Sequence, residues 1–270
     1  MCTIPPPPAP PPPPPPLPSS NRIQDSVTAD QFTVTSKLIE LEPDLCSWTS
    51  SDPELRRACI FESVCTDKPP YRIKYTKFTP ITQVGPTCGL VALSMVINGK
   101  IAPDKILDIS KSEGYSSNGE MFSCKNMAKL AGKVFGSASI EDINVRVNSR
   151  SLFSPETVES LLEGAVLLVP YDADVNHTPS LKNGHTAHWA LICGVILVKK
   201  PEAPYTAEKD NIYVLCRHGK SKYLCAWNLA KLAQSNNNLW EFSPKKHTDG
   251  LVYVLPEGGI GGNNGLRGQL

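Results

Sequence analysis

The sequence predicts an α+β domain, because helical patterns come first along the chain and β-rich apolar runs follow them. The clearest helical pattern is a stripe of apolar residues spaced three and four apart, at positions 127, 130, 131, 134 and 135. The clearest strands are three apolar runs separated by turns, at 165–172, 188–198 and 211–218. Helices first and strands later are typical of α+β folds.

The 270 residues suffice for one medium-sized domain with tails. We expect the domain at 51–258, between a disordered proline-rich leader and linker at 1–50 and a flexible glycine-rich tail at 259–270. Residues 5–18 contain 12 of the 26 prolines, and such a run adopts polyproline II because each ring fixes φ and removes an N–H donor. This run is either a stiff spacer or a ligand for an aromatic groove on a partner.

Local start and stop signals place the first elements of the domain. Asp52 as N-cap and Pro53 in the first turn predict a short helix within 52–64, and loose alternation predicts a strand within 71–81. A helix over 87–98 should follow and end at Asn98-Gly99. Its residues Leu90, Leu93 and Ile97 share one face by their spacing, so we expect this face to be buried.

The same signals define two later helices. The sequence Ser154-Pro155-Glu156 opens a helix that Gly164 closes, and the segment 226–235 returns to a helical pattern after the last strand. No internal repeat is evident. Apart from the strand within 71–81, the predicted order is therefore helices, then three strands, then one more helix.

Composition excludes several classes of function. Basic and acidic residues number 27 and 26, so no overall charge favours nucleic acid or a membrane surface as a partner. No apolar run reaches the roughly 18 residues of a membrane-spanning helix, and the start of the chain does not resemble a secretory signal. The nine cysteines form no CxxC pair, which indicates reduced thiols and a cytoplasmic protein without a metal or other cofactor.

One of these thiols has a local context typical of a nucleophile. In "TQVGPTCGLVALSMVING" (82–99), Cys88 stands between a Gly-Pro-Thr turn and a predicted helix. The unpaired N–H groups and the dipole of a helix N-terminus favour an anion, so we expect a lowered thiol pKa and a reactive thiolate. The alternative is that Cys88 is a small apolar core residue.

A nucleophilic cysteine requires an imidazole, and His188 is the strongest of the five candidates. It opens the most apolar predicted strand, which would fix its backbone while the ring projects from the strand end. A histidine satisfied within the core is one alternative. A metal site with His185 is another, but two positions three apart on a strand point to opposite faces.

The order Gln83, Cys88-Gly89, helix and then "HWALICG" (188–194) resembles the papain-like cysteine peptidases. This resemblance implies a thiol helix packed on an antiparallel sheet, with Gln83 and the Cys88 backbone N–H as oxyanion donors. It also implies a group at the end of the next strand that orients the imidazole. That position holds His218 instead of the usual Asn or Asp, and the alternatives lie in the loop before His188: Asp172, Asp174 and Asn176.

A closer resemblance covers residues 75 to 258. The segments "QVGPTCGLVAL", "GYSSNGEMFS", "LLVPYDADVNHTP", "GHTAHWAL", "HGKSKY" and "TDGLVYVLP", behind a poly-Pro leader, resemble the actin maturation protease family. Members of that family remove the N-acetylated Met or Cys from immature actin. The resemblance therefore implies a cysteine aminopeptidase with actin as substrate, and profilin as the protein that binds the leader. A papain-like isopeptidase of another specificity and a catalytically idle poly-Pro adaptor are the alternatives.

Overall fold

The structure is a computed structural model that describes residues 45–141, 143–149, 151–202 and 208–270. These residues belong to one compact unit, Asp44–Leu270. The polyproline run at 5–18 and most of the predicted leader lie outside the described residues. None of the helices in the described ranges combines the length and the apolar composition needed to cross a membrane.

The domain is built on one antiparallel sheet of six strands, ordered β3-β2-β4-β5-β6, with β1 paired to the far end of β4. All strand pairings are antiparallel, as the sequence resemblance implied. The strand bounds are Arg72–Tyr75 (β1), Leu167–Ala173 (β2), Pro179–Ser180 (β3), Ala187–Leu197 (β4), Ile212–His218 (β5) and Cys225–Asn228 (β6). The three strands predicted from apolar runs are β2, β4 and β5.

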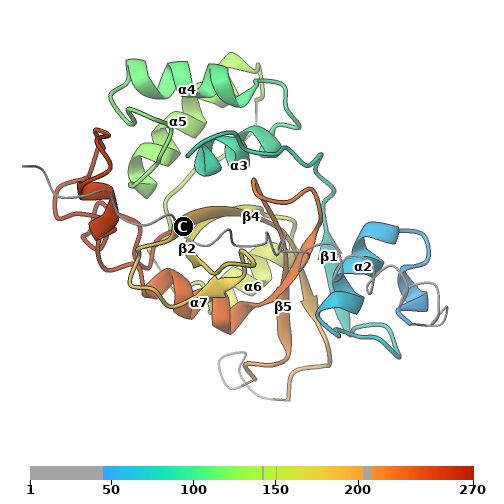
Figure 1. Ribbon diagram of the computed structural model, residues 1–270. Helices are drawn as coiled ribbons and strands as arrows, with labels where there is room; N and C mark the ends of the chain where they lie inside the picture. The colour runs from blue at the N-terminus through green and yellow to red at the C-terminus, as the bar shows by residue number, and fades with distance from the viewer. Residues whose placement is uncertain (1–44, 142, 150, 203–207) are drawn as a thin grey trace, which may run out of the picture. The chain divides into compact units, whose positions relative to one another are not determined.

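Helices cover both faces of this sheet (Figure 1). Helix α3 packs on β4, and α4 and α5 lie beyond it, whereas α6 and α7 cover the opposite face. The helix bounds are Pro53–Phe61 (α2), Cys88–Val96 (α3), Pro103–Ser112 (α4), Cys124–Ser137 (α5), Pro155–Leu162 (α6) and Leu229–Asn237 (α7), with 3₁₀ turns at Ser47–Thr49 (η1) and Pro244–His247 (η3). This mixed arrangement confirms the α+β prediction.

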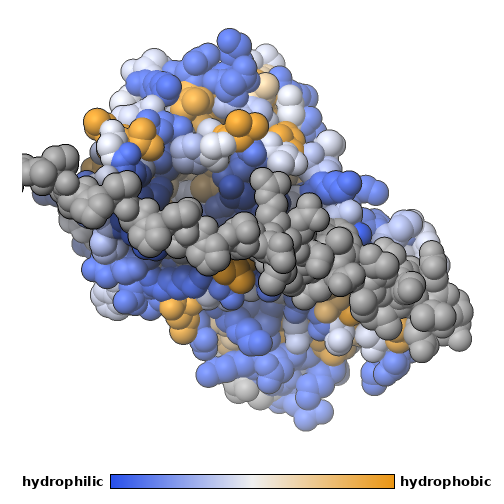
Figure 2. Space-filling view, in the orientation of Figure 1, coloured by the Kyte–Doolittle hydropathy of each residue, from blue (hydrophilic) through white to orange (hydrophobic). Residues whose placement is uncertain are grey.

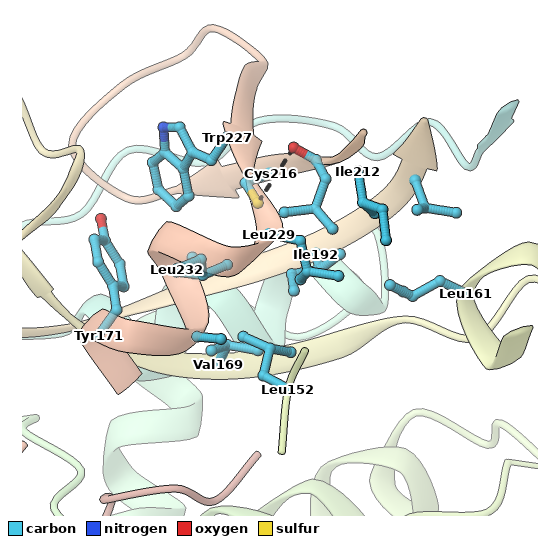
Figure 3. Close-up of a cluster of buried hydrophobic side chains, with 14 of the residues drawn as sticks. Leu152, Leu161, Val169, Tyr171, Ile192, Ile212, Cys216, Trp227, Leu229 and Leu232 are labelled. Carbon is cyan, nitrogen blue, oxygen red and sulfur yellow. Dashed lines mark hydrogen bonds between the residues drawn. The ribbon is translucent and has the colours of Figure 1, made fainter. Parts of the chain in front are cut away.

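The strand β4 is almost wholly buried, because helices lie above and below it. On the α6 and α7 side, the apolar residues of β2, β4 and β5 form a continuous core with both helices (Figure 3). Figure 3 shows Val169 beneath Leu232, Ile192 beside Leu229, and Leu161 at the edge of the same cluster. This core fixes the backbone of β4, and the first residues of β4 carry the predicted catalytic histidine.

The capping signals in the sequence are accurate where the side chain satisfies a helix N–H. The Asp52 carboxylate accepts from the Leu55 N–H at 3.0 Å, and the Ser154 hydroxyl accepts from the Thr157 N–H at 3.2 Å. In α3, the predicted face of Leu90, Leu93 and Ile97 is buried, which confirms that prediction. The sequence analysis missed α4, and it missed β6 because Asn228 ends that strand and at the same time caps α7.

The residues expected to form a flexible tail are packed against the domain. Ile260, Leu266 and Gln269 are buried, and Leu270 exchanges two backbone hydrogen bonds with Asn148 at 2.8 and 3.0 Å. The glycines allow this packing because the chain passes so close to its neighbours that a Cβ at Gly261 would collide with the Trp240 backbone. The sequence analysis predicted flexibility for 259–270 from the glycine content. In the structure the glycines instead permit close contact with the rest of the domain.

A buried ion pair ties α2 to the sheet. Arg217, which is 1% exposed on β5, bonds the Glu54 carboxylate at 2.5 Å, and the Tyr75 hydroxyl lies 3.4 Å from the same guanidinium nitrogen.

All cysteines in the described ranges are free thiols. The surface that Figure 2 colours by hydropathy is largely hydrophilic, with hydrophobic residues in small separate groups.

Candidate active site

Cys88 is the first residue of α3, directly after the turn that the sequence indicated. Gly85 has a φ of 66°, and the Thr87 hydroxyl donates to the Val84 carbonyl at 2.9 Å, which closes the turn. The Thr87 side chain therefore does not cap α3. The N–H groups in the first turn of α3 point toward the helix N-terminus, where Cys88 lies. Cys88 is only 8% exposed.

The expected lowering of the Cys88 pKa is wrong for this structure, because burial outweighs the local donors. Burial raises the pKa of the thiol above its ordinary value, whereas hydrogen bonds from the Trp189 and Gly89 backbones and the Lys246 charge lower it. Glu120 adds a smaller effect that raises it. The thiol is consequently neutral at rest, with donors arranged around the position where a negative sulfur would form.

Cys88 and His188 line the same cavity, which has a volume of about 330 Å³. The cavity lies where the start of α3 and the start of β4 meet several loops, the 3₁₀ turn η3 and the C-terminal segment. Its wall consists of Gln83, Gly85, Pro86, Cys88, Glu120, Met121, Phe122, Ala187, His188, Trp189, Lys220, Lys246 and Leu266. No hydrogen bond joins the thiol to the imidazole among the contacts of the described residues, and such bonds often tighten only once a substrate is bound.

His188 is the second residue of β4, paired across the sheet with Tyr171. Its ring is surrounded by other rings, with centroid distances of 5.8 Å to Tyr171, 6.3 Å to His177 and 6.0 Å to His218. Burial, followed by the charges that His218, His177 and Lys220 can carry, lowers the pKa of His188 to about 3. The ring is therefore neutral at physiological pH, and the same burial makes its protonated form unfavourable in the resting site.

His218 lies beside His188, but its ring nitrogens contact other groups. Its Nδ1 accepts from the Lys220 backbone N–H at 3.3 Å, and its Nε2 lies 3.7 Å from the Cys225 sulfur. The Nε2 of His188 is buried without a hydrogen-bond partner. The two rings thus lie edge to face, and no hydrogen bond joins them among the contacts of the described residues.

Gln83 also lines the cavity, and its position is tightly fixed. Its backbone N–H donates to the Gly219 carbonyl at 2.7 Å, and its side-chain Nε2 donates to the Gly85 carbonyl at 2.7 Å. A Cβ at Gly219 would lie 2.8 Å from the Gln83 Oε1. One of the two amide protons of Gln83 is therefore committed to the turn before Cys88.

The acidic alternatives from the loop before His188 have other contacts. Asp172 is buried and accepts backbone hydrogen bonds from Lys182, Gly184 and Thr186 at 2.7 to 3.1 Å, so it fixes the loop that leads into β4. Asp174 pairs with Lys182 at 3.0 Å, and Asn176 is exposed. His185, the partner in the metal alternative, bonds Glu241 at 2.8 Å at the surface.

Three features of the site were absent from the sequence analysis. Trp189 follows His188, and its indole N–H donates to the Met121 carbonyl at 2.8 Å, which holds the ring against the start of α3. His177, in the left-handed region at φ 62°, stacks near His188. Glu120 and Lys246 form a charge pair at 3.7 Å on the cavity wall. The contacts of Trp189 with Met121 and of Glu120 with Lys246 join residues far apart in sequence, so no local sequence pattern indicates them.

Replacing Gly89 by alanine should reduce kcat by roughly ten-fold or more, because a Cβ there would lie 3.1 Å from the Trp189 ring and 2.7 Å from Met127 Cε. The Met127 side chain and the Trp189 ring, which follows His188, must then shift, although alanine is the better helix former. Gly132→Ala in α5 is the matched control, since a Cβ there meets nothing within 4 Å. Equal steady-state rates for both variants would contradict the expectation.

Comparisons with known proteins indicate the family of the chain. The family model described as "Actin maturation protease-like, C-terminal domain" matches residues 78–196, a range that includes Cys88 and His188. A Drosophila melanogaster protein named actin maturation protease is 42% identical over 83% of this chain and 79% of its own length. The Danio rerio protein of the same name is 34% identical over 73% of this chain and 72% of its own length. The Homo sapiens protein of that name is 33% identical over 70% of this chain and 62% of its own length. No solved structure matches the chain.

These matches identify the chain as a protease by class. More particularly, it belongs to the actin maturation protease family, as the sequence motifs indicated.

Proposed function

We propose that this protein is a cysteine-type aminopeptidase of papain-like architecture, with Cys88 as nucleophile and His188 as general base. The observation that supports this best is the shared cavity, where a thiol at a helix N-terminus and a neutral imidazole line one wall. Backbone donors from Gly89 and Trp189 already contact the sulfur. This arrangement suits acyl transfer, because charge that develops on the sulfur meets donors that need no rearrangement.

The proposed substrate is the N-terminus of immature actin, from which the N-acetylated Met or Cys is removed. The name shared by the relatives supports actin as the protein that is processed. The small, partly enclosed cavity supports removal of a short terminal group instead of cleavage within a long extended chain. Actin lies in the cytoplasm, which is the location we propose for this protein.

The first half of the reaction transfers the terminal acyl group to the enzyme. His188 takes the Cys88 proton as the sulfur attacks the carbonyl carbon of the acetylated residue, and the carbonyl oxygen becomes negative. The Cys88 backbone N–H and the second amide proton of Gln83 are the proposed donors to this oxygen. The C–N bond then breaks, His188 protonates the departing amine, and the acetylated residue remains as a thioester on Cys88.

The second half returns the enzyme to its resting state. His188 removes a proton from water, whose oxygen attacks the thioester carbonyl, and the C–S bond breaks. The sulfur regains a proton from His188, and the acetylated amino acid leaves with a free carboxyl group. His218 is proposed to hold the His188 ring in place by its edge contact, and it does so without changing charge at neutral pH.

One experiment tests the function directly. Purified protein and a Cys88→Ala control are mixed with immature acetylated actin, and the actin N-terminus is read by mass spectrometry. We expect the mass of one acetylated residue to be lost only with the intact thiol. An unchanged actin mass with the wild-type protein would exclude actin as substrate.

The leader is proposed to bind profilin and so to hold the protease near profilin-bound actin. A polyproline II segment docks on aromatic grooves, and tethering gives an effective concentration that reaches about millimolar. Deleting residues 5–18 should leave kcat on a short acetylated peptide unchanged. It should slow processing of profilin-bound actin much more than processing of free actin, measured by the same mass shift. Equal effects on both actin forms would leave the spacer as the function of the run.

A further inference from the structure

The segment 256–270 contributes a residue to the cavity although it lies far from Cys88 and His188 in sequence. Leu266 is 1% exposed and lines the same cavity wall as the thiol. Its neighbours Ile260 and Gln269 are also buried. This glycine-rich segment, which we call the strap, therefore has a place in the site that its composition did not indicate.

The position of Leu266 is fixed from several sides. Its N–H donates to the Ile260 carbonyl at 2.7 Å, which closes the strap on itself. The Cys124 N–H at the start of α5 donates to the Gly265 carbonyl at 3.1 Å, which ties the strap to the helical side of the cavity. A Cβ at Gly265 would collide with the Ile260 carbonyl, so this close turn requires glycine.

The strap is anchored further along as well. The Arg267 Nε donates to the Asn237 carbonyl at 3.1 Å, and its guanidinium lies 3.1 Å from the centroid of the Trp240 ring. The Asn236 side chain donates to the Gln269 carbonyl at 3.0 Å. Leu266 therefore has anchored residues on both sides of it along the chain.

Leu266 shares the cavity wall with other apolar residues, among them Met121 and Phe122. The charged residues of the wall near them are engaged with each other, since Lys246 bonds Glu120 at 3.7 Å and lies 5.3 Å from the centroid of the Phe122 ring. A substrate group placed between Leu266, Met121 and Phe122 therefore meets an apolar surface beside the thiol. Such a surface accepts an apolar side chain and rejects a charged one.

We propose that Leu266 helps to determine which N-terminal residue the enzyme removes. Its side chain would form part of the surface that receives the side chain of that residue. The inference rests on the proposed function and adds to it the residue that would select the side chain of the terminal amino acid. A thioether or thiol side chain suits this surface because sulfur is polarizable and makes favourable contacts with aromatic rings such as Phe122. The strap is thereby part of the substrate site.

The test compares acetylated peptides that differ only in the terminal residue, which is Ala, Met or Phe. Leu266→Ala enlarges the space beside the thiol, so kcat/KM for Phe relative to Met should rise about ten-fold or more. Leu266→Phe fills the space, so kcat/KM for Met relative to Ala should fall by a similar factor. Each ratio is measured on one preparation, so the fraction of folded enzyme cancels.

Leu255→Ala is the matched control, because Leu255 precedes the strap, is 38% exposed and is not part of the cavity wall. Its ratios should equal those of the wild type. If Leu266→Ala does not fold, Leu266→Val makes a smaller change with the same expected direction. Unchanged ratios in active Leu266 variants would overturn the proposal. A wild-type protein that cleaves none of the peptides would instead overturn the proposed function.

Discussion

Replacing Cys88 by alanine should lower kcat on acetylated actin by on the order of 10⁴-fold or more, because no other group in the cavity can form the thioester. The wall of the cavity contains one thiol, that of Cys88. The next thiol near the histidines, Cys225, lies 3.7 Å from His218 and is not part of this wall. Single-turnover assays with mass detection of the thioester measure the effect directly.

His188→Ala should cause a loss of similar size, and the double variant should be hardly worse than either single one. The two side chains act as a unit, so removing the second costs little once the first is gone. Cys225→Ala is the matched control and should retain most of the activity. If Cys88→Ala remained fully active, the catalytic assignment would be refuted; strictly additive losses would show that the two residues act independently.

The catalytic candidates could be predicted because their signals are local. A turn followed by an apolar helix marks the position of Cys88, and an apolar strand preceded by a polar loop marks that of His188. Both elements formed where expected, as α3 and β4. Local patterns suffice in such cases because the backbone position of the residue is set by the element that carries it.

The properties of the site that depend on packing could not be predicted in this way. The helix N-terminus alone favours a thiolate, but the neighbours that bury Cys88 come from β4 and from loops distant in sequence, and their effect on the pKa is opposite and larger. The strap was mistaken for a flexible tail for the same reason, since glycine content is identical in mobile chain and in closely packed chain. Neither outcome is encoded in a short stretch of residues.

The cluster of histidines should make the domain lose stability in mild acid. Burial is the main cause that lowers the pKa of His188 to about 3 and that of His218 to about 4, from an ordinary value of 6.5. Below pH 6.5 the unfolded chain therefore binds protons at both positions while the folded domain does not. The contribution of the two neutral histidines to the free energy of unfolding is present above pH 6.5. It is lost as the pH falls toward their folded-state pKa values.

The size of this effect follows from the number of protons taken up on unfolding. Each histidine should reduce the free energy of unfolding by up to about 1.4 kcal/mol per pH unit once the unfolded chain is fully protonated, so the pair should remove about 3 kcal/mol between pH 6.5 and pH 5. That is a large share of the roughly 5–15 kcal/mol that stabilises a typical domain. Urea denaturation at a series of pH values measures the slope, independently of any difference in stability at neutral pH.

Variants assign the slope to individual residues. His218→Gln removes one of the two titrating groups and should reduce the slope by about half, because glutamine keeps much of the size and polarity without taking up a proton. His247→Gln is the control for the substitution itself, since His247 is exposed on the surface and lies outside the cluster of histidines around His188. A slope in His218→Gln equal to that of the wild type would mean that His218 accepts a proton in the folded domain at mild pH. The neutral imidazole at His188, on which the proposed proton transfer depends, would then have a charged neighbour, and its role as base would have to be reconsidered.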